Sequence, residues 1–176
     1  TKKLRSHNTD SEATDVNGLT AFTSTGFNLG NDSGYNYSTG TYVSWTWRKA
    51  PSFFSLHKFT HSNPTSSSYD FSADGLNNLG MVIIKRIDAA GQWRVWHRSA
   101  TSGHLLKLNS TNASASDVTF SVSGTTATMV GGEPSGQYIW YASADNSSED
   151  AADRLISCGA YTGCLLYTSD AADDGL

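Results

Sequence analysis

Residues 81–98 read MVIIKRIDAAGQWRVWHR, and this stretch decides the fold. Two runs of apolar, β-branched and aromatic residues flank residues 88–91, DAAG. A short connection that ends in glycine between two such runs is typical of a β-hairpin. The first run is apolar on both faces, which predicts a central strand with cover on each side. In the second run Trp93 and Trp96 point to opposite faces, so at least one of them is expected in the core.

The composition around this hairpin favours an all-β protein. Of the 176 residues, 38% are hydrophobic and only 16% are charged, so Ser, Thr, Asn and Gly fill much of the remainder. These small polar residues suit turns between short strands and compete with helical hydrogen bonds. The net charge of −4 gives no basic surface, which argues against nucleic acid as a partner. No apolar run approaches the roughly 18 residues needed to cross a bilayer, so no membrane insertion is expected.

Short strand candidates continue on both sides of the hairpin. In the region 49–146 they are residues 53–60, 69–73, 81–87, 92–98, 105–109, 118–123, 125–130 and 138–143. Earlier candidates are Phe22, residues 27–29 and residues 42–47, and only residues 11–16 have helical character. Regular short strands broken by polar turns predict an antiparallel β-sandwich of the jelly-roll or lectin-like kind.

Three pairs of similar segments recur in the same order. They are residues 3–6 with 107–110, residues 40–45 with 136–141, and residues 51–60 with 153–162, at offsets of 104, 96 and 102. Conserved order favours a tandem repeat, and chance similarity among Ser/Thr-rich strands is the alternative. The repeat predicts a C-terminal part of a preceding unit at 1–48, one complete sandwich unit at 49–146, and a linker with the first strand of a following unit at 147–163. Residues 1–48 would then either dock on the complete unit or stay partly unformed.

The last residues have a different origin. Residues 164–174, CLLYTSDAADD, match one reading frame of a transposase adaptor used to prepare DNA sequencing libraries. Residues 164–176 are therefore predicted to be adaptor read-through in a metagenomic fragment of a longer protein, and a genuine acidic tail is the alternative. On this interpretation Cys158 is the native cysteine, and a disulfide with Cys164 is not expected.

Further motifs extend through residues 1–163. Those of the complete unit are FFS at 53–55, FT at 59–60, DGL at 74–76, GMVIIKR at 80–86, WRVWH at 93–97, LKLNS at 106–110 and YIWYA at 138–142. Together they resemble a tandem domain of unassigned function in bacteriophage tail-fibre and other virion-associated proteins. The resemblance implies a non-catalytic structural or adhesion module of the virion tail, whose partners are other virion subunits, with a homotrimer as one arrangement. Family members tend to have a His-Gly-Leu-Gly-like turn where this chain has DGLN at 74–77, so no role of that histidine is carried over.

The sequence gives little indication of a catalytic or metal-binding site. His57 and His61 would lie roughly 13 Å apart on a strand, too far to share one metal, and no cofactor is expected. His97 has no nucleophile or carboxylate in a recognisable arrangement. Hydrolysis of glycans needs two positioned carboxylates, whereas those of residues 10–15 and 145–153 fit exposed turns. We therefore predict no catalytic residue, and a tail-associated glycan hydrolase is the least favoured alternative.

Aromatic residues give the better indication of binding. Residues 31–40, NDSGYNYSTG, place Tyr35 and Tyr37 in a loop of small polar residues. Such loops present rigid aromatic area at low entropic cost. A host-surface glycan stacked on either tyrosine, as in a lectin-like recognition module, is one interpretation, and packing of one tyrosine on the sandwich edge is the other. Trp96 lies between two arginines and is a candidate for an exposed or inter-subunit contact.

Overall fold

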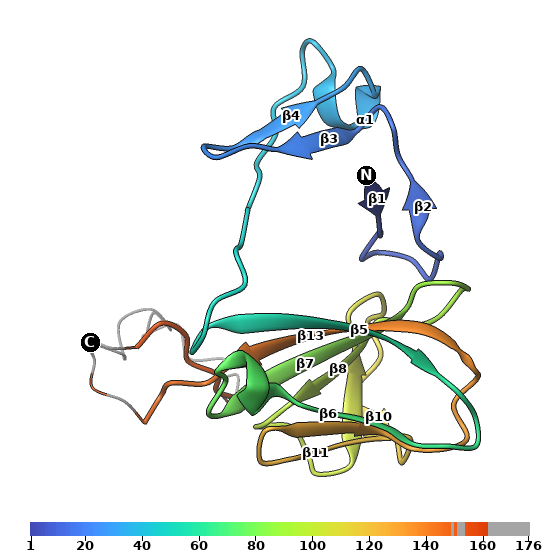
Figure 1. The fold of residues 1–176 in the computed structure, drawn as a ribbon, viewed down its shortest axis with the longest axis vertical. Helices are drawn as coiled ribbons and strands as arrows, with labels where there is room; N and C mark the ends of the chain where they lie inside the picture. Colours follow the sequence, from blue (N-terminus) through green and yellow to red (C-terminus); the bar gives the residue numbers. More distant parts are fainter. Residues whose placement is uncertain (149, 151–153, 162–176) are drawn as a thin grey trace, which may run out of the picture.

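The computed structural model describes residues 1–148, 150 and 154–161. The predicted adaptor read-through at 164–176 lies outside these residues. Figure 1 shows a β-sandwich formed by the chain after about residue 50, and a smaller N-terminal lobe that stands off from it beyond β5. Two connections join the lobe to the sandwich: the loop between β1 and β2, and a long extended stretch that leads into β5.

The larger sheet has six strands in the order β10-β9-β8-β7-β13-β5, and every neighbouring pair is antiparallel. The strands are β5 (Phe54–His61), β7 (Leu79–Arg86), β8 (Arg94–His97), β9 (His104–Lys107), β10 (Ala115–Ser116) and β13 (Gly136–Ala144). The predicted hairpin is confirmed, since β7 and β8 pair with Met81 opposite His97. β7 is also an interior strand, because β13 pairs with its other edge.

The connection of this hairpin is longer than the four residues predicted. The loop between β1 and β2 forms hydrogen bonds with residues of this connection. The N–H of Glu12 donates to the carbonyl of Ile87 over 2.8 Å, and the N–H of Gly91 donates to the carbonyl of Thr9 over 2.9 Å. The buried ammonium of Lys85 donates to the carbonyls of Thr9 and Gly91 over 3.1 and 3.0 Å. Burial lowers the pKa of Lys85. The first connection between lobe and sandwich is therefore built on a buried lysine.

A three-stranded sheet packs on the inner face of the larger one. Its strands are β6 (Ser67–Asp70), β11 (Phe120–Ser123) and β12 (Thr126–Met129), in the antiparallel order β11-β12-β6. Trp140 of β13 is fully buried between the sheets, with ring centroids 4.4 Å from Phe59 and 5.7 Å from Phe120. Two antiparallel sheets around one aromatic core form an all-β sandwich, as predicted.

The predicted strand at 69–73 is wrong in its second half. β6 ends at Asp70, and a 3-10 helix, η1 (Phe71–Asp74), follows it. The Asp70 side chain caps this turn by accepting from the N–H of Ser72 over 3.0 Å, and Gly75 ends it with φ of 80°. A side-chain cap therefore diverts the chain from the sheet.

The N-terminal lobe consists of two-stranded sheets and one short helix. β1 (Lys2–Lys3) pairs with β2 (Ala13–Thr14), and β3 (Leu19–Phe22) pairs with β4 (Phe27–Leu29). The helical character expected at 11–16 is wrong, because β2 lies there and the helix α1 is Ser33–Asn36, capped by Asp32. The strand expected at 42–47 is also wrong, since this stretch has no strand pairing in the described chain and is drawn as an extended trace (Figure 1).

After β13 the chain turns back onto the sandwich. Residues 154–161, where the first strand of a further unit was expected, carry no strand. The N–H of Asn146 donates to the carbonyl of Ile156 over 2.8 Å, and the Ile156 side chain packs against the core. Asp145 is buried and accepts from Arg98, from the N–H and hydroxyl of Ser147, and from the N–H of Cys158.

These contacts predict an acid-sensitive turn. Burial by itself raises the pKa of Asp145, but the donors of Cys158 and Ser147 and the charge of Arg98 outweigh it and bring the pKa below its usual range. A lowered carboxyl pKa gives stability that is present above about pH 4 and is lost as the pH falls through the folded-state value. Asp145→Asn should therefore cost about 2 kcal/mol at pH 7, and less at pH 3.

Urea unfolding at both pH values measures this difference. The exposed Asp150→Asn is the matched control and should change the free energy of unfolding by less than about 0.5 kcal/mol. An Asp145→Asn effect of the same size at pH 3 and pH 7 would contradict the assignment of a charged carboxylate.

Candidate interaction surface

The N-terminal lobe exposes a group of large apolar side chains. Val43 is 83% exposed, Trp45 80% and Phe22 66%. The β3–β4 hairpin, α1 and residues 42–47 together line an open cavity of about 320 Å³. Its lining residues, called here the lobe face, are Leu19, Phe22, Phe27, Leu29, Tyr35, Tyr42, Val43, Ser44, Trp45, Thr46 and Trp47. Contiguous exposed apolar patches of this kind mark interaction sites in soluble proteins.

The lobe face is held at one end by hydrogen bonds. The hydroxyl of Tyr42 accepts from the N–H of Tyr37 over 3.1 Å and donates to the carbonyl of Ser33 over 3.2 Å. At the other end the Trp47 ring lies 6.1 Å from that of Phe54 and 6.0 Å from that of Tyr141, both on the sandwich. Val43 and Trp45 lie between these anchors and are the most exposed part of the face.

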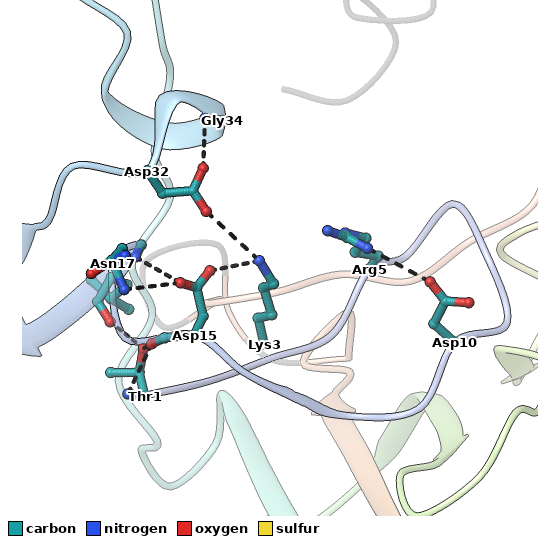
Figure 2. Close-up of polar contacts among 10 residues, drawn as sticks. Thr1, Lys3, Arg5, Asp10, Asp15, Asn17, Asp32 and Gly34 are labelled. Carbon is teal, nitrogen blue, oxygen red and sulfur yellow. Dashed lines mark hydrogen bonds and ion pairs between the residues drawn. The ribbon is translucent and has the colours of Figure 1, made fainter.

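A cluster of charged residues connects the elements of the lobe. Figure 2 shows Lys3 between two carboxylates, with its ammonium 2.7 Å from Asp15 and 3.9 Å from Asp32. Asp15 also accepts from the N–H groups of Asn17 and Gly18 over 3.1 and 2.8 Å. The hydrogen bond from Lys3 lowers the pKa of Asp15, and the same bond raises the pKa of Lys3. The cluster joins β1, the residues after β2 and the cap of α1, so its carboxylates are engaged in holding the lobe together.

The three predicted binding residues do not form one site. Tyr35 and Tyr37 lie at α1, where Tyr35 is half-buried with the Lys3 ammonium 5.4 Å from its ring centroid and Tyr37 is exposed. Trp96 lies on β8 in the sandwich, half-buried against the core. Tyr35 is therefore part of the lobe face, Tyr37 follows it at the end of α1, and Trp96 belongs to the other part of the molecule.

The nearest approach to catalytic chemistry is a buried polar group at β5. Asp74 accepts from Ser55 over 2.5 Å, from Lys49 over 2.6 Å and from Tyr69 over 3.1 Å, and its pKa is lowered, since these bonds outweigh the effect of burial. Ser55 is fully buried and bonds directly to the carboxylate, while His57 stacks on Tyr69 at 3.6 Å. Ser55 is shielded from solvent, and the hydrogen bonds of Asp74 join η1 to β5, to β6 and to the residue Lys49 before β5.

Among the described residues no three or more His, Cys, Asp or Glu side chains are grouped so that they could hold a metal ion. No helix in the described part of the chain is long and apolar enough to cross a membrane.

Comparison with known proteins gives a family for this fold. A family model described as a domain of unknown function, DUF7483, matches residues 1–148. The chain belongs to this family. No curated protein and no solved structure matches the chain. The family match covers the lobe and the sandwich without a break, so the lobe face lies within the family's own domain.

Sequence reasoning found part of this surface and missed its most exposed residues. Tyr35 and Tyr37 were selected from the composition of their loop. Val43 and Trp45 were missed because residues 42–47 were interpreted only as a strand candidate. The signal was nevertheless present in the alternation: Val43, Trp45 and Trp47 share one face of an extended chain. An apolar face that finds no covering layer in its own lobe stays exposed.

Proposed function

We propose that this chain is a non-catalytic structural or adhesion module of a bacteriophage tail or tail-fibre protein. The observation that carries the modular role is the lobe face, where Val43 and Trp45 present apolar area suited to burial against another part of an assembly. The tail setting is supported by the resemblance of the sequence motifs. The internal engagement of Asp15, Asp74 and Asp145 also favours a structural role, because each carboxylate is occupied by donors from its own chain.

The parent gene and the particle together test this proposal. The open reading frame should contain further copies at a spacing of about 100 residues and should lie beside genes for virion structural proteins. Antibodies raised against the purified chain should decorate the tails of phage particles by immunogold electron microscopy. Labelling confined to the soluble fraction of infected cells, with bare particles, would contradict the tail assignment.

A carbohydrate-binding module is the second candidate, favoured by the exposed rings of Tyr37 and Trp45 on one lobe. If the structural role is the whole function, the chain should bind no spot of a glycan array. Tyr37→Ala and Trp45→Ala should then be silent as well. Tyr161→Ala is the matched control, since that ring is exposed outside the lobe. A glycan bound by the parent chain and the control but lost in Tyr37→Ala would replace the structural proposal with receptor recognition.

A further inference from the structure

The first sheet of the lobe has the same register as the outer strands of the sandwich. In β1–β2, Lys2 pairs with Thr14 and Lys3 with Ala13. In β9–β10, residue 104 pairs with 116 and residue 105 with 115. Each position in the first sheet differs from its counterpart in the second by 102 residues. The sequence match of residues 3–6 has an offset of 104, and a two-residue difference leaves every side chain on the same face.

Hydrogen bonds outside the strands follow the same offset. The N–H of Asp15 donates to the carbonyl of Thr1 over 3.0 Å, and that of Asp117 donates to the carbonyl of Gly103 over 2.8 Å. Both aspartates then accept at Oδ1 from the N–H two residues later, over 3.1 and 2.9 Å. These residue pairs are again 102 apart, and the sequence similarity did not include them.

The later elements of the lobe continue the correspondence. The β3–β4 hairpin follows the first sheet as β11–β12 follows β9–β10. A backbone bond closes each hairpin, from Gly30 to Gly18 over 2.8 Å and from Val130 to Thr119 over 2.9 Å. Residues 42–47 come next, and their sequence match places them at β13. The lobe thus has the order of β9 to β13.

The strands that the lobe lacks all belong to the first half of the sandwich. In the sandwich β13 lies between β5 and β7, β9 pairs with β8, and β12 pairs with β6. In the lobe, β1–β2 and β3–β4 are separate two-stranded sheets, and residues 42–47 pair with no described strand. The equivalents of β5, β6, β7 and β8 would pair with the free edges of β1 and β4 and with both edges of residues 42–47.

We infer that residues 1–48 are the second half of a sandwich unit, and that the lobe face is the docking site for a first half of the kind formed by residues 49–102. The occupant is such a segment in a preceding unit of the same polypeptide. Residues 42–47 would enter between its β5 and β7 as β13 does, with Tyr42 at the place of Tyr138, which is buried in the sandwich. This inference deepens the structural part of the proposed function and does not depend on the tail setting.

The test extends the full chain by a second copy of residues 49–102 placed directly before Thr1. Ser102 of the copy then precedes Thr1 as Ser102 precedes Gly103 in the sandwich. Amide hydrogen exchange at residues 42–47 should slow by about 100-fold or more relative to the unextended chain, because these amides enter a sheet. A prefix with the same composition in scrambled order is the control and should leave exchange fast. No slowing with the native prefix, or equal slowing with the scrambled one, would overturn the inference.

Disulfide trapping tests the register separately. In the sandwich Ile139, the counterpart of Val43, lies opposite Lys58 of β5. In a background with Cys158→Ser and Cys164→Ser, Val43→Cys should therefore crosslink with Lys58→Cys of the prefix, whose side chain is exposed on β5. Leu56→Cys in the prefix is the off-register control and should react at least tenfold more slowly. Equal rates at the two positions, or a crosslinked dimer of two chains in place of the internal loop, would overturn the docking site. Both measurements use the purified chain, so their failure is distinguishable from failure of the tail assignment.

Discussion

Trp140→Ala is expected to destabilise the sandwich by about 3–5 kcal/mol. Trp140 is fully buried on the central strand β13 and contacts rings from both sheets, including Phe59 of β5 and Phe120 of β11. Because a domain of this size has a total stability of about 5–15 kcal/mol, the variant should unfold at much lower urea concentration. Urea titration followed by far-UV circular dichroism measures the change.

Trp140→Phe separates the loss of volume from the loss of the indole N–H. The Nε1 atom of Trp140 is buried with no hydrogen-bond partner among the described residues. Phenylalanine keeps most of the ring and removes this unpaired donor, so the cost should be only about 1–2 kcal/mol. The exposed Trp45→Ala should change the stability by less than about 0.5 kcal/mol. Equal losses in Trp140→Ala and Trp140→Phe would contradict the packing argument.

The strands of the sandwich were largely predictable because their apolar residues form short runs bounded by turn residues, some of them alternating and some apolar on both faces. The hairpin of β7 and β8 was placed from the two apolar runs on either side of residues 88–91, and the two strands pair. β13 was also expected inside a sheet because residues 138–141 are apolar on both faces. Both strand assignments depend only on residues that are close in sequence, and a pattern of apolar residues reports on such neighbours.

Residues 42–47 show where that information stops. Residues 42–45 among them match residues 138–141 in sequence, yet only the latter lie in a strand, β13. A strand needs neighbours for its backbone groups, and β13 finds β5 and β7 on its two edges. The sequence pattern of a single segment does not indicate whether partner strands are present on its two edges. The lobe face was missed for this reason.

Lys85 illustrates the same limit for a single side chain. Its alternation with Ile83 and Met81 places it on the outer face of β7, where a solvated ammonium would be the ordinary expectation. It is instead buried, because the carbonyls of Thr9 and Gly91 accept hydrogen bonds from its ammonium. One of these partners is 76 residues away in the sequence, so the pairing follows from tertiary structure alone.

Arg94→Met is the second large destabilisation, expected at about 3 kcal/mol at pH 7. The guanidinium of Arg94 binds both carboxylate oxygens of Glu133 over 2.7 and 2.9 Å and donates to Thr119 over 2.8 Å. It also lies 3.4 Å from the carboxylate of Asp117. Methionine would leave two partly buried carboxylates beside each other without a cation. Arg94→Lys should recover only part of the loss, because an ammonium cannot form the paired hydrogen bonds.

The pH dependence of this loss distinguishes lost charge from lost packing. Burial by itself raises the pKa of Asp117, but hydrogen bonds from Thr119 and the charge of Arg94 outweigh it, and the pKa is lowered. The resulting stability is present above about pH 4 and is lost as the pH falls through the folded-state pKa. Without Arg94 the pKa of Asp117 moves upward, so Arg94→Met should lose less stability than the parent between about pH 5 and pH 2. Urea unfolding across this range, with Glu133→Gln and the double variant completing a cycle, measures the coupling. Parallel pH profiles for the parent and Arg94→Met would mean that Arg94 acts through its packing and not through its charge.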